Sequence, residues 1–508
     1  MRVEVMDTTL RDGEQTSGVA FKDVEKLSIA KVLLKEVKVN RIEVASARVS
    51  KGETEAVKKI TSWAKKNDYL DRVEVLGFID GSKSLDWIKE AGGKVVNLLC
   101  KGSLEHVKVQ LNKSFDEHIS DIKKEIQYAS KLGIKVNIYL EDWSNGMKNS
   151  PDYVFSFVEE LKDEAVERFM LPDTLGILNP DNSYKYCQQM IEKFPDICFD
   201  FHAHNDYGLA IANTLEAVKA GMDTVHTTVN GLGERTGNAP LSNTVAALHD
   251  HLQVETTIVE KNLREISKLV ESFSGERIPP NMPVLGDNVF TQVCGVHADG
   301  DNKGQLYFND LLPERFGRTR KYALGKTSGK ASIRKNLEEL GIELEDDDLK
   351  KVTQEVIELG DKKNNITLDD LPYIISEVLG SSLIEEKVRL ENFSITNTNG
   401  LSPIAIMKIN IDGEVFEETS TGDGQYDAFM GALTKVYDKL GRKLPILQDY
   451  LVTIPPGGKT SALVETVITW VVDGREFKTK SLDPDQTTSA IKATMKMLNI
   501  IENNGYNL

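Results

Sequence analysis

The first half of the chain alternates two patterns of hydrophobic residues. Short runs of aliphatic and β-branched residues are each followed by a longer stretch whose apolar residues recur every three or four positions. The first of these stretches has one apolar face opposite lysines and glutamates, as is typical of an amphipathic helix. That face consists of Leu27, Ala30, Leu34 and Val37. The expected strands lie at 3–6, 41–44, 73–76, 95–99, 136–140, 168–171, 198–204 and 224–229.

Eight repeats of strand and helix over about 250 residues are the pattern of a (β/α)8 barrel. A doubly wound open sheet is the competing architecture. A dinucleotide-binding sheet of that kind needs Gly-x-Gly-x-x-Gly after its first strand, whereas this chain has DTTLRDGEQ at 7–15. We therefore expect an α/β fold with an N-terminal TIM barrel, whose chemistry lies at the carboxyl ends of its strands.

One expected strand ends in two histidines. His202 and His204 lie two residues apart in FDFHAHND at 199–206, so both side chains leave the same face and can reach one metal ion. Asp12 follows the first strand and Asn238 the eighth, at the same rim of a barrel. These four side chains suit an octahedral divalent cation such as magnesium or manganese, and zinc is possible. Each of them alone also fits a turn or an ordinary strand.

The composition narrows the functional classes. The chain has 508 residues, enough for more than one domain, and a formal net charge of −17, which argues against a nucleic-acid-binding surface. Its four cysteines are scattered, and the sequence has neither a signal-peptide run nor the ~20 consecutive apolar residues of a membrane span. We expect a cytoplasmic protein that acts on small molecules and binds neither nucleic acid nor membrane.

Three motifs resemble those of the α-isopropylmalate, homocitrate and citramalate synthases, in the same order. They are LRDGEQ at 10–15 with Lys26 beyond it, the histidine strand through Gly208, and GERTGN at 233–238. The resemblance continues through GVHADG at 295–300 and LGKTSGK at 324–330 to the end of the chain, and is greatest to the citramalate synthases. It implies a Claisen-type condensation in which acetyl-CoA adds to the ketone of an α-keto acid and the thioester is then hydrolysed.

The resemblance also implies roles for residues at the rim. A keto acid can chelate the metal through its ketone and carboxylate, with Arg11 stabilising the charge that develops on oxygen. Thr174 matches the threonine that binds the keto-acid carboxylate. A structural salt bridge for Arg11 and a helix N-cap for Thr174 are the alternatives.

The proton of the acetyl methyl group needs a base. The resemblance points to Glu141 together with His297 and Tyr307, which come from the segment after the barrel. A carboxylate, an imidazole and a phenol can relay a proton, and which of them takes it stays open. The alternative for Glu141 is a carboxylate that orients a metal ligand or an arginine.

The walls of the keto-acid pocket decide the substrate. The family places Leu76, Leu99 and Tyr139 around the keto-acid side chain. All three are large, and packed walls exclude extra carbons, so we expect pyruvate as substrate and citramalate as product. The alternatives are 2-oxoisovalerate, as in 2-isopropylmalate synthases, and a set of side chains that is simply barrel core.

The chain after the barrel divides into two further parts. We expect the barrel at 1–285, helical linker subdomains at 286–388, and a C-terminal domain at 389–508. In the last part Asp412-Gly413 recurs 61 positions later as Asp473-Gly474, and each copy predicts two strands around the turn followed by a helix. This duplicated β+α arrangement is superfluous for the chemistry of a complete barrel.

The resemblance makes the C-terminal domain allosteric and the protein a homodimer. The effector would be a branched-chain amino acid, isoleucine or leucine, contacted by Tyr426, Asp427 and Gln486. Helix capping is the alternative for Asp427. Two other functions fit parts of the sequence: a CoA-independent metal-dependent aldolase or lyase, and an amino-acid sensor with an inactive barrel. Both are disfavoured, the first by the C-terminal repeat and the second by the intact rim motifs.

Overall fold

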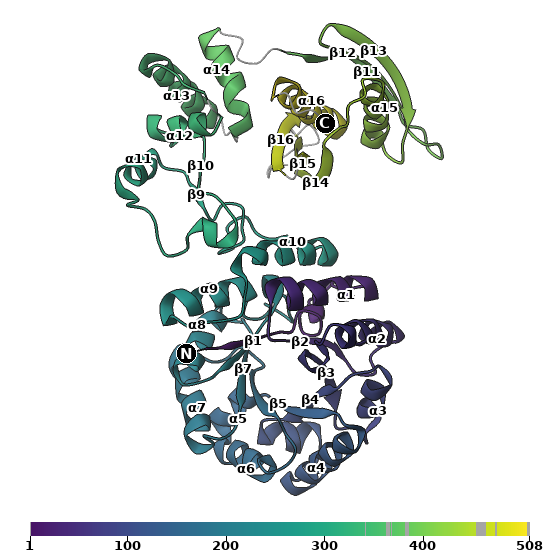
Figure 1. Cartoon of the computed structure of the whole chain (residues 1–508), viewed down its shortest axis with the longest axis vertical. Helices are drawn as coiled ribbons and strands as arrows, with labels where there is room; N and C mark the ends of the chain where they lie inside the picture. Colours follow the sequence, from purple (N-terminus) through teal and green to yellow (C-terminus); the bar gives the residue numbers. More distant parts are fainter. Residues whose placement is uncertain are drawn as a thin grey trace. The chain divides into compact units, whose positions relative to one another are not determined.

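A computed structural model describes residues 2–340, 342–361, 366, 368–380, 386–453, 464–472 and 475–504. The chain forms two compact units, Met1–Thr291 with Phe308–Lys321 and Gln292–Tyr307 with Tyr322–Leu508 (Figure 1). None of the helices in these described ranges has the length and apolar character needed to cross a bilayer.

The first unit is the expected barrel. Eight parallel strands close on themselves in chain order, with β1 paired to both β2 and β8 (Figure 1). The strands are β1 (Glu4–Asp7), β2 (Arg41–Ser46), β3 (Val73–Phe78), β4 (Val95–Lys101), β5 (Lys135–Glu141), β6 (Arg168–Asp173), β7 (Phe199–Ala203) and β8 (Thr224–Thr227). The prediction of a (β/α)8 architecture is confirmed.

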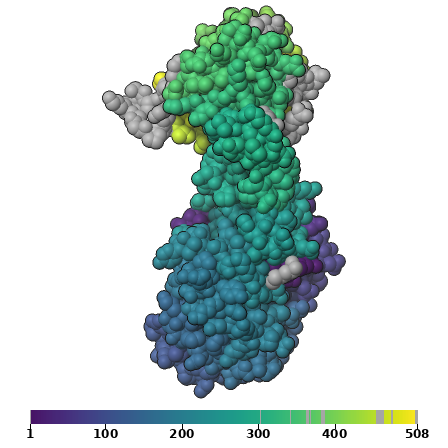
Figure 2. Space-filling view, turned by 90° about the vertical axis from the view of Figure 1, so that its left-hand side faces the viewer, coloured from purple at the N-terminus to yellow at the C-terminus, as the bar shows by residue number. Residues whose placement is uncertain are grey.

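Helices surround the strands. They are α1 (Asp23–Lys31), α2 (Lys51–Lys66), α3 (Lys83–Glu90), α4 (Phe115–Leu132), α5 (Trp143–Asn149), α6 (Pro151–Leu161), α7 (Pro180–Lys193), α8 (Ala210–Lys219), α9 (Leu241–Leu252) and α10 (Leu263–Ser274). Side chains satisfy the first backbone N–H groups of several helices: Ser50 caps α2, Ser114 caps α4 and Asn179 caps α7. The space-filling view of Figure 2 shows one face of the barrel unit, where side chains cover the surface without open gaps.

The barrel has two cores, because alternate residues of each strand point to opposite sides. Apolar side chains such as Val5, Val44 and Val75 pack outward against the helices. Inside the barrel Met6, Leu76, Tyr139 and Met170 form a separate apolar cluster. Buried polar side chains also occupy strand positions of this inward parity, namely Arg41, Glu43, Glu74, Asn97, Asn137, Asp200 and His226. The interior is thus an apolar wall on top of a charged layer.

The second unit begins with helices. They are α11 (Gly295–Gly304), α12 (Lys330–Leu340), α13 (Asp346–Asp361) and α14 (Leu371–Leu379), and α12 to α14 share a small apolar core that includes Ile333, Val352 and Ile375. The intervening segment 308–321 belongs to the barrel unit, where Arg315 forms ion pairs with Asp250 and Glu260.

The C-terminal part consists of two similar halves. The first contains β11 (Val388–Thr396), β12 (Ile404–Ile411), β13 (Glu414–Thr421) and α15 (Gln425–Lys439); the second contains β14 (Ile446–Thr453), β15 (Val464–Val472), β16 (Arg475–Asp483) and α16 (Gln486–Asn504). Each half is a three-stranded antiparallel sheet with one helix, and the halves share one core. The duplication is confirmed.

The prediction of two strands per half is wrong, because β11 and β14 were missed. Both carry an irregularity, between Leu390 and Asn392 in β11 and between Leu447 and Asp449 in β14. An extra residue shifts the side-chain alternation by one and hides the period of two. The turn at Asp412-Gly413 joins β12 to β13 with positive φ at both residues. The equivalent Asp473-Gly474 lies outside the described residues.

One acidic residue at the end of β1 is buried without a cation. The Asp7 carboxyl group is 1% exposed, and its Oδ1 accepts a hydrogen bond of 3.0 Å from the Thr9 backbone N–H. Its Oδ2 has no hydrogen-bond partner within the described ranges. Burial raises the pKa of Asp7 to about 7.

This raised pKa predicts a pH-dependent stability. Between pH ~4 and pH ~7 folded Asp7 holds a proton that the unfolded chain has released, so the free energy of unfolding should fall over this range and level off above it. The free energy of unfolding of Asp7→Asn should not show this fall. The difference in free energy of unfolding between the variant and wild type should therefore shift by on the order of 2 kcal/mol in favour of the variant from pH 5 to pH 8. Urea unfolding at both pH values checks this. Parallel pH profiles for the two proteins would contradict it.

Candidate active site at the carboxyl ends of the barrel strands

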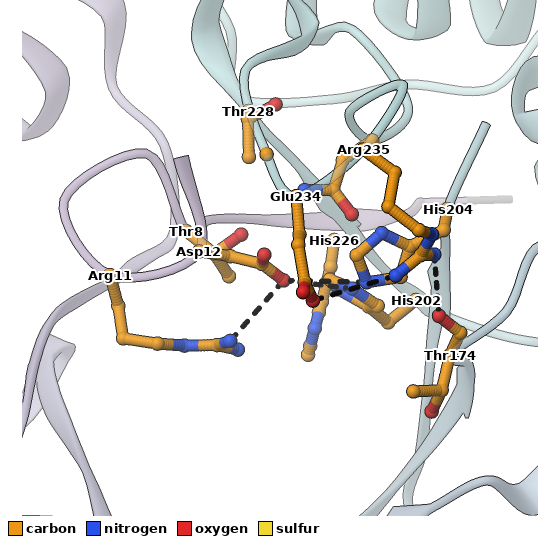
Figure 3. A network of polar contacts seen from close by, with 12 residues as sticks. Thr8, Arg11, Asp12, Thr174, His202, His204, His226, Thr228, Glu234 and Arg235 are labelled. Atoms are coloured by element: carbon orange, nitrogen blue, oxygen red, sulfur yellow. Dashed lines mark hydrogen bonds and ion pairs between the residues drawn. The ribbon is translucent and has the colours of Figure 1, made fainter. Parts of the chain in front are cut away.

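Three residues that could hold a metal ion converge at the barrel rim (Figure 3). Asp12 Oδ2 lies 3.2 Å from His202 Nε2 and 3.8 Å from His204 Nε2. All three side chains are buried, and their potential ligand atoms lie within 4.8 Å of one another. The structure therefore brings together the side chains at the ends of the first and seventh strands, as the sequence predicted. Their arrangement suits one metal ion.

Asn238 reaches the same place through the loop after β8. It forms an isolated bridge with His204, and its Nδ2 donates to the Leu232 carbonyl at 3.1 Å. Its buried Oδ1 has no hydrogen-bond partner among the described residues, and neither has Asp12 Oδ1. Buried oxygens without partners are costly unless something else satisfies them. These acceptors, together with the two imidazoles, fit a divalent cation.

Glycines allow this loop to fold tightly. Gly237 has φ of +85°, and a Cβ there would lie 1.8 Å from the Gly231 carbonyl oxygen. Gly233 has φ of +153°, and its Cβ would lie 2.2 Å from Asn238 Nδ2. Any larger residue would displace the loop, so the two glycines of GERTGN position Asn238.

The charge states of this group suit a cation. Burial alone would raise the pKa of Asp12, but Arg11, with Nη1 3.2 Å from Oδ2, and the two histidines lower it well below its usual range. Burial lowers the pKa of His202, and that of His204 to about 4. An ionised carboxylate and neutral imidazoles are the forms that bind metals.

Arg11 is held by a chain of buried polar groups. Its Nε pairs with Glu43, Glu43 Oε1 accepts from Asn97 at 2.7 Å, and Asn97 Oδ1 accepts from Asn137 at 2.8 Å. Arg11 Nη2 also donates to the Tyr139 hydroxyl at 3.3 Å. Together with the ion pair between Nη1 and Asp12, these contacts engage three of the five N–H donors of the guanidinium and leave two for a substrate. A salt bridge and a role at the site are therefore compatible for Arg11.

Lys26 fixes the loop that carries Arg11 and Asp12. Its ammonium group is fully buried, donates to the Leu10 carbonyl at 3.0 Å, and pairs with Glu14 at 2.6 Å and Glu53 at 2.7 Å. Glu53 lies in α2, so the ammonium ties the loop after β1 to the helix layer. A buried charge paired in this way is a positional constraint rather than a net source of stability.

The predicted pocket walls lie together. Leu76 and Tyr139 belong to the interior cluster with Met6 and Met170, and Leu99 packs against it. The interpretation as barrel core is correct for burial, since Leu76 is 5% and Tyr139 is 3% exposed. The contact of the Tyr139 hydroxyl with Arg11 nevertheless places this cluster next to the group of polar side chains at the rim.

Thr174 follows β6 near the histidines. Its Oγ1 accepts a hydrogen bond of 2.9 Å from the Asp142 backbone N–H, which leaves its own hydroxyl hydrogen for another acceptor. The N-cap interpretation is wrong, because Asn179 caps α7. Arg235 joins the loops around Thr174, since it donates to the Thr174 carbonyl at 2.8 Å (Figure 3). It also donates to Asp206 at 2.7 Å.

Glu141 lies at the end of β5 and pairs with Lys101 at the end of β4. The sequence did not draw attention to Lys101, although it occupies an inward position at the same rim. His297 and Tyr307 belong to the second unit, where their ring centroids lie 4.1 Å apart and His297 Nδ1 is 2.9 Å from Gln292 Oε1. That these two side chains act together with Glu141 stays a prediction.

The effector residues partly converge. The rings of Tyr426 and Tyr450 lie with centroids 5.4 Å apart and planes tilted by 31°, and the Tyr426 hydroxyl shares a hydrogen bond of 2.7 Å with Thr494. Gln486 acts on the same ring, since its side chain partly offsets the rise that burial gives to the pKa of Tyr450. Asp427 instead accepts a hydrogen bond of 2.9 Å from the Asp423 backbone N–H, one residue before the N-cap Gly424, and so closes the turn that leads into α15.

His226 is a functional candidate that the sequence pattern did not single out. It lies two residues before Thr228, at a position of β8 that points into the barrel. Its Nδ1 lies 2.9 Å from the Tyr139 hydroxyl oxygen. The signal was present, since a histidine in a buried parallel strand needs polar partners. Its partners are on β5 and β7, and the pattern of a single strand cannot identify them.

A closed barrel with an Asp–His–His group at its carboxyl rim defines a recognisable class. The chain belongs to the HMGL-like family, whose profile matches residues 2–270. Residues 284–364 match a homocitrate synthase post-HMGL domain-like profile, and residues 365–502 match the LeuA allosteric (dimerisation) domain.

Its relatives include synthases of two names. A probable 2-isopropylmalate synthase of Methanopyrus kandleri is 35% identical, with 98% of each chain covered. From Methanocaldococcus jannaschii, an (R)-citramalate synthase is 34% identical over 99% of this chain and all of its own length, and a 2-isopropylmalate synthase is 34% identical over 98% of this chain and 95% of its own. Overall identity therefore does not separate the two names.

The metal group predicts a measurable affinity. His202→Ala should weaken Mn²⁺ binding at least about 100-fold, because loss of even an outer partner of a metal ligand costs 10–100-fold. Isothermal titration of the folded protein, with folding checked by circular dichroism, measures this. His251→Ala, an exposed histidine on α9, is the matched control. Equal Mn²⁺ affinity of His202→Ala and wild type would exclude His202 as a ligand.

Proposed function

We propose that this protein is an acetyl-CoA-dependent synthase that condenses acetyl-CoA with pyruvate and water to give (R)-citramalate and CoA. Full-length similarity to citramalate and 2-isopropylmalate synthases supports a condensing enzyme. The proposed setting is branched-chain amino-acid biosynthesis in the cytoplasm. The choice of pyruvate is carried by one observation, the packed cluster of Leu76, Leu99 and Tyr139 beside Arg11.

The metal centre would consist of Asp12, His202, His204 and Asn238. These residues would hold a divalent cation, magnesium or manganese by their ligand set, which would supply Lewis acidity to the ketone of the keto acid. The free oxygens of Asp12 and Asn238 support this assignment. Zinc is the alternative, because two imidazoles and a carboxylate also suit that ion.

Arg11 and Thr174 bind and orient the keto acid in this mechanism. The two remaining donors of Arg11 face developing negative charge on oxygen, and a preorganised donor of this kind is typically worth about 10²–10³ in rate. Its ion pair with Glu43 prevents the guanidinium from swinging away. Thr174 donates its hydroxyl hydrogen to the carboxylate.

Proton removal from the acetyl methyl group is assigned to Glu141, His297 and Tyr307. The close contact of the His297 and Tyr307 rings supports a shared role for these two side chains. Lys101 holds the Glu141 carboxylate in place, which also fits the alternative of an orienting carboxylate. We leave the base as either Glu141 or His297.

The pocket selects the smallest keto acid. Leu76 and Tyr139 are almost completely buried, so larger substrates would have to displace packed side chains. Pyruvate presents a methyl group to this wall, whereas 2-oxoisovalerate presents an isopropyl group. A 2-isopropylmalate synthase is the second candidate, because relatives of that name are equally similar.

Initial rates with competing keto acids test the substrate. We expect kcat/KM for pyruvate to exceed that for 2-oxoisovalerate by at least about 10-fold, since each badly accommodated methylene costs ~1–3 kcal/mol. Tyr139→Ala should move the preference toward 2-oxoisovalerate. Tyr184→Ala, on the outer surface of α7, is the control. A higher kcat/KM of wild type for 2-oxoisovalerate would assign the protein as a 2-isopropylmalate synthase, and no condensation with either acid would favour an aldolase, a lyase or a sensor.

The C-terminal domain is proposed to bind the end product of the pathway. The match to the LeuA allosteric (dimerisation) domain supports regulation and a homodimer. Tyr426 and Gln486 approach Tyr450 from the two repeats, which supports a small-ligand site there. Isoleucine is the expected effector if citramalate is the product, and leucine if 2-isopropylmalate is.

Inhibition assays test this assignment. The concentration of isoleucine that halves the rate should rise at least about 10-fold in Gln486→Ala, the effect of losing about one hydrogen bond to a charged ligand. Gln448 is another exposed glutamine of the same domain, and the Gln448→Ala variant should be inhibited by isoleucine at the same concentration as wild type. A wild-type enzyme that neither isoleucine nor leucine inhibits would refute the sensor.

A further inference from the structure

A line of buried polar side chains runs through the barrel to the pocket wall. Arg41 Nη2 lies 2.5 Å from Asp200 Oδ2, which lies 3.0 Å from His226 Nε2, and His226 Nδ1 lies 2.9 Å from the Tyr139 hydroxyl. Asp200 is 0%, His226 1% and Tyr139 3% exposed. The line links β2, β7, β8 and β5, and the proposed mechanism uses only Tyr139 at its end.

The partners set the direction of each hydrogen bond. Asp200 sits between two guanidinium groups, since Arg168 Nη1 lies 3.0 Å from its Oδ1, so it is a carboxylate that only accepts. His226 Nε2 must then carry the hydrogen. In a neutral imidazole this leaves Nδ1 as an acceptor, so the Tyr139 hydroxyl donates its single hydrogen to His226.

The same hydroxyl accepts from Arg11 Nη2 at 3.3 Å. With its hydrogen on His226, Tyr139 therefore offers the pocket a phenol ring and an oxygen lone pair, with no donor. The carboxylate and ketone oxygens of a keto acid are acceptors, and they are repelled at such a wall. An alkyl group meets no such penalty.

We propose that His226, held by Asp200, is a positioning residue that turns the Tyr139 hydroxyl hydrogen out of the pocket and thereby reserves this wall for the alkyl group of the keto acid. This inference rests on the proposed function. A phenol released from His226 can donate to the keto-acid carboxylate. The substrate then binds in a second, reversed orientation with its carboxylate toward Tyr139, away from Thr174, and this orientation does not react.

Nonproductive binding has a kinetic signature that general loosening of the pocket lacks. Substrate bound in the wrong orientation lowers kcat and KM by the same factor and leaves kcat/KM nearly unchanged. Loss of packing instead raises KM or lowers kcat/KM. The two explanations of the His226 line can therefore be separated by steady-state kinetics.

Two substitutions divide the contacts of the imidazole. In His226→Gln the side-chain amide reaches the position of Nε2, near Asp200, and leaves Tyr139 without its acceptor. In His226→Asn the amide reaches the position of Nδ1 and keeps an acceptor for Tyr139. We expect His226→Gln to lower both kcat and KM for the preferred keto acid by about 3- to 10-fold, the effect of one competing hydrogen bond. His226→Asn should restore both toward wild type.

The double variant completes the test. If His226 acts through the hydroxyl, His226→Gln in a Tyr139→Phe background should change neither kcat nor KM relative to Tyr139→Phe alone. Ser183→Ala, which removes one buried hydrogen bond to the Asn213 carbonyl outside the barrel strands, controls for lost stability, and melting temperatures are compared throughout. If His226→Gln does not fold, the comparison of His226→Asn in the two Tyr139 backgrounds replaces it, with no effect expected in either.

The outcomes separate this inference from the proposed function. A wild-type protein that condenses no keto acid refutes the function. If wild type is active, a raised KM in His226→Gln, or an equal effect of His226→Gln with and without the Tyr139 hydroxyl, overturns the positioning role of His226 and leaves the function standing.

Discussion

The buried Asp12 carboxylate is the constraint around which the barrel rim is arranged. One oxygen faces Arg11 at 3.2 Å and His202 at 3.2 Å, and the other has no partner among the described residues. A buried carboxylate stays ionised only beside a positively charged side chain or a metal cation. The groups near Asp12 must therefore match its charge as well as its shape. The fully buried Lys26 ammonium, the glycines of the loop after β8, and Glu43 behind Arg11 all hold this arrangement in place.

The interior of the barrel contains two layers of side chains, one polar and one apolar. Charged and amide side chains occupy inward positions from Arg41 and Glu74 to Asp200, each with a partner of opposite charge or polarity. They support an apolar wall of Met6, Leu76, Tyr139 and Met170. Tyr139 belongs to both layers, because its ring packs in the wall and its hydroxyl joins the polar network. The account of keto-acid selection depends on this dual position.

Much of the architecture was predictable from the pattern of residues. Closure of eight strands follows from repeated apolar runs and amphipathic helices, and the meeting of Asp12 with His202 and His204 follows because parallel strands end at one rim. The partners of His226 could not be predicted, because they depend on the stagger of strands that are distant in sequence. The first strand of each C-terminal half was missed for a different reason, since irregularities near Leu390 and Leu447 interrupt the alternation.

The central claim is that metal, Arg11 and Tyr139 together fix one orientation of a small keto acid. A crystal structure of the full-length protein with Mn²⁺ and pyruvate tests it most directly. The account predicts one ion on Asp12, His202, His204 and Asn238, the pyruvate carboxylate near Thr174, and the methyl group against the Tyr139 ring. An ion on other residues, or a carboxylate oxygen hydrogen-bonded to the Tyr139 hydroxyl, would contradict it.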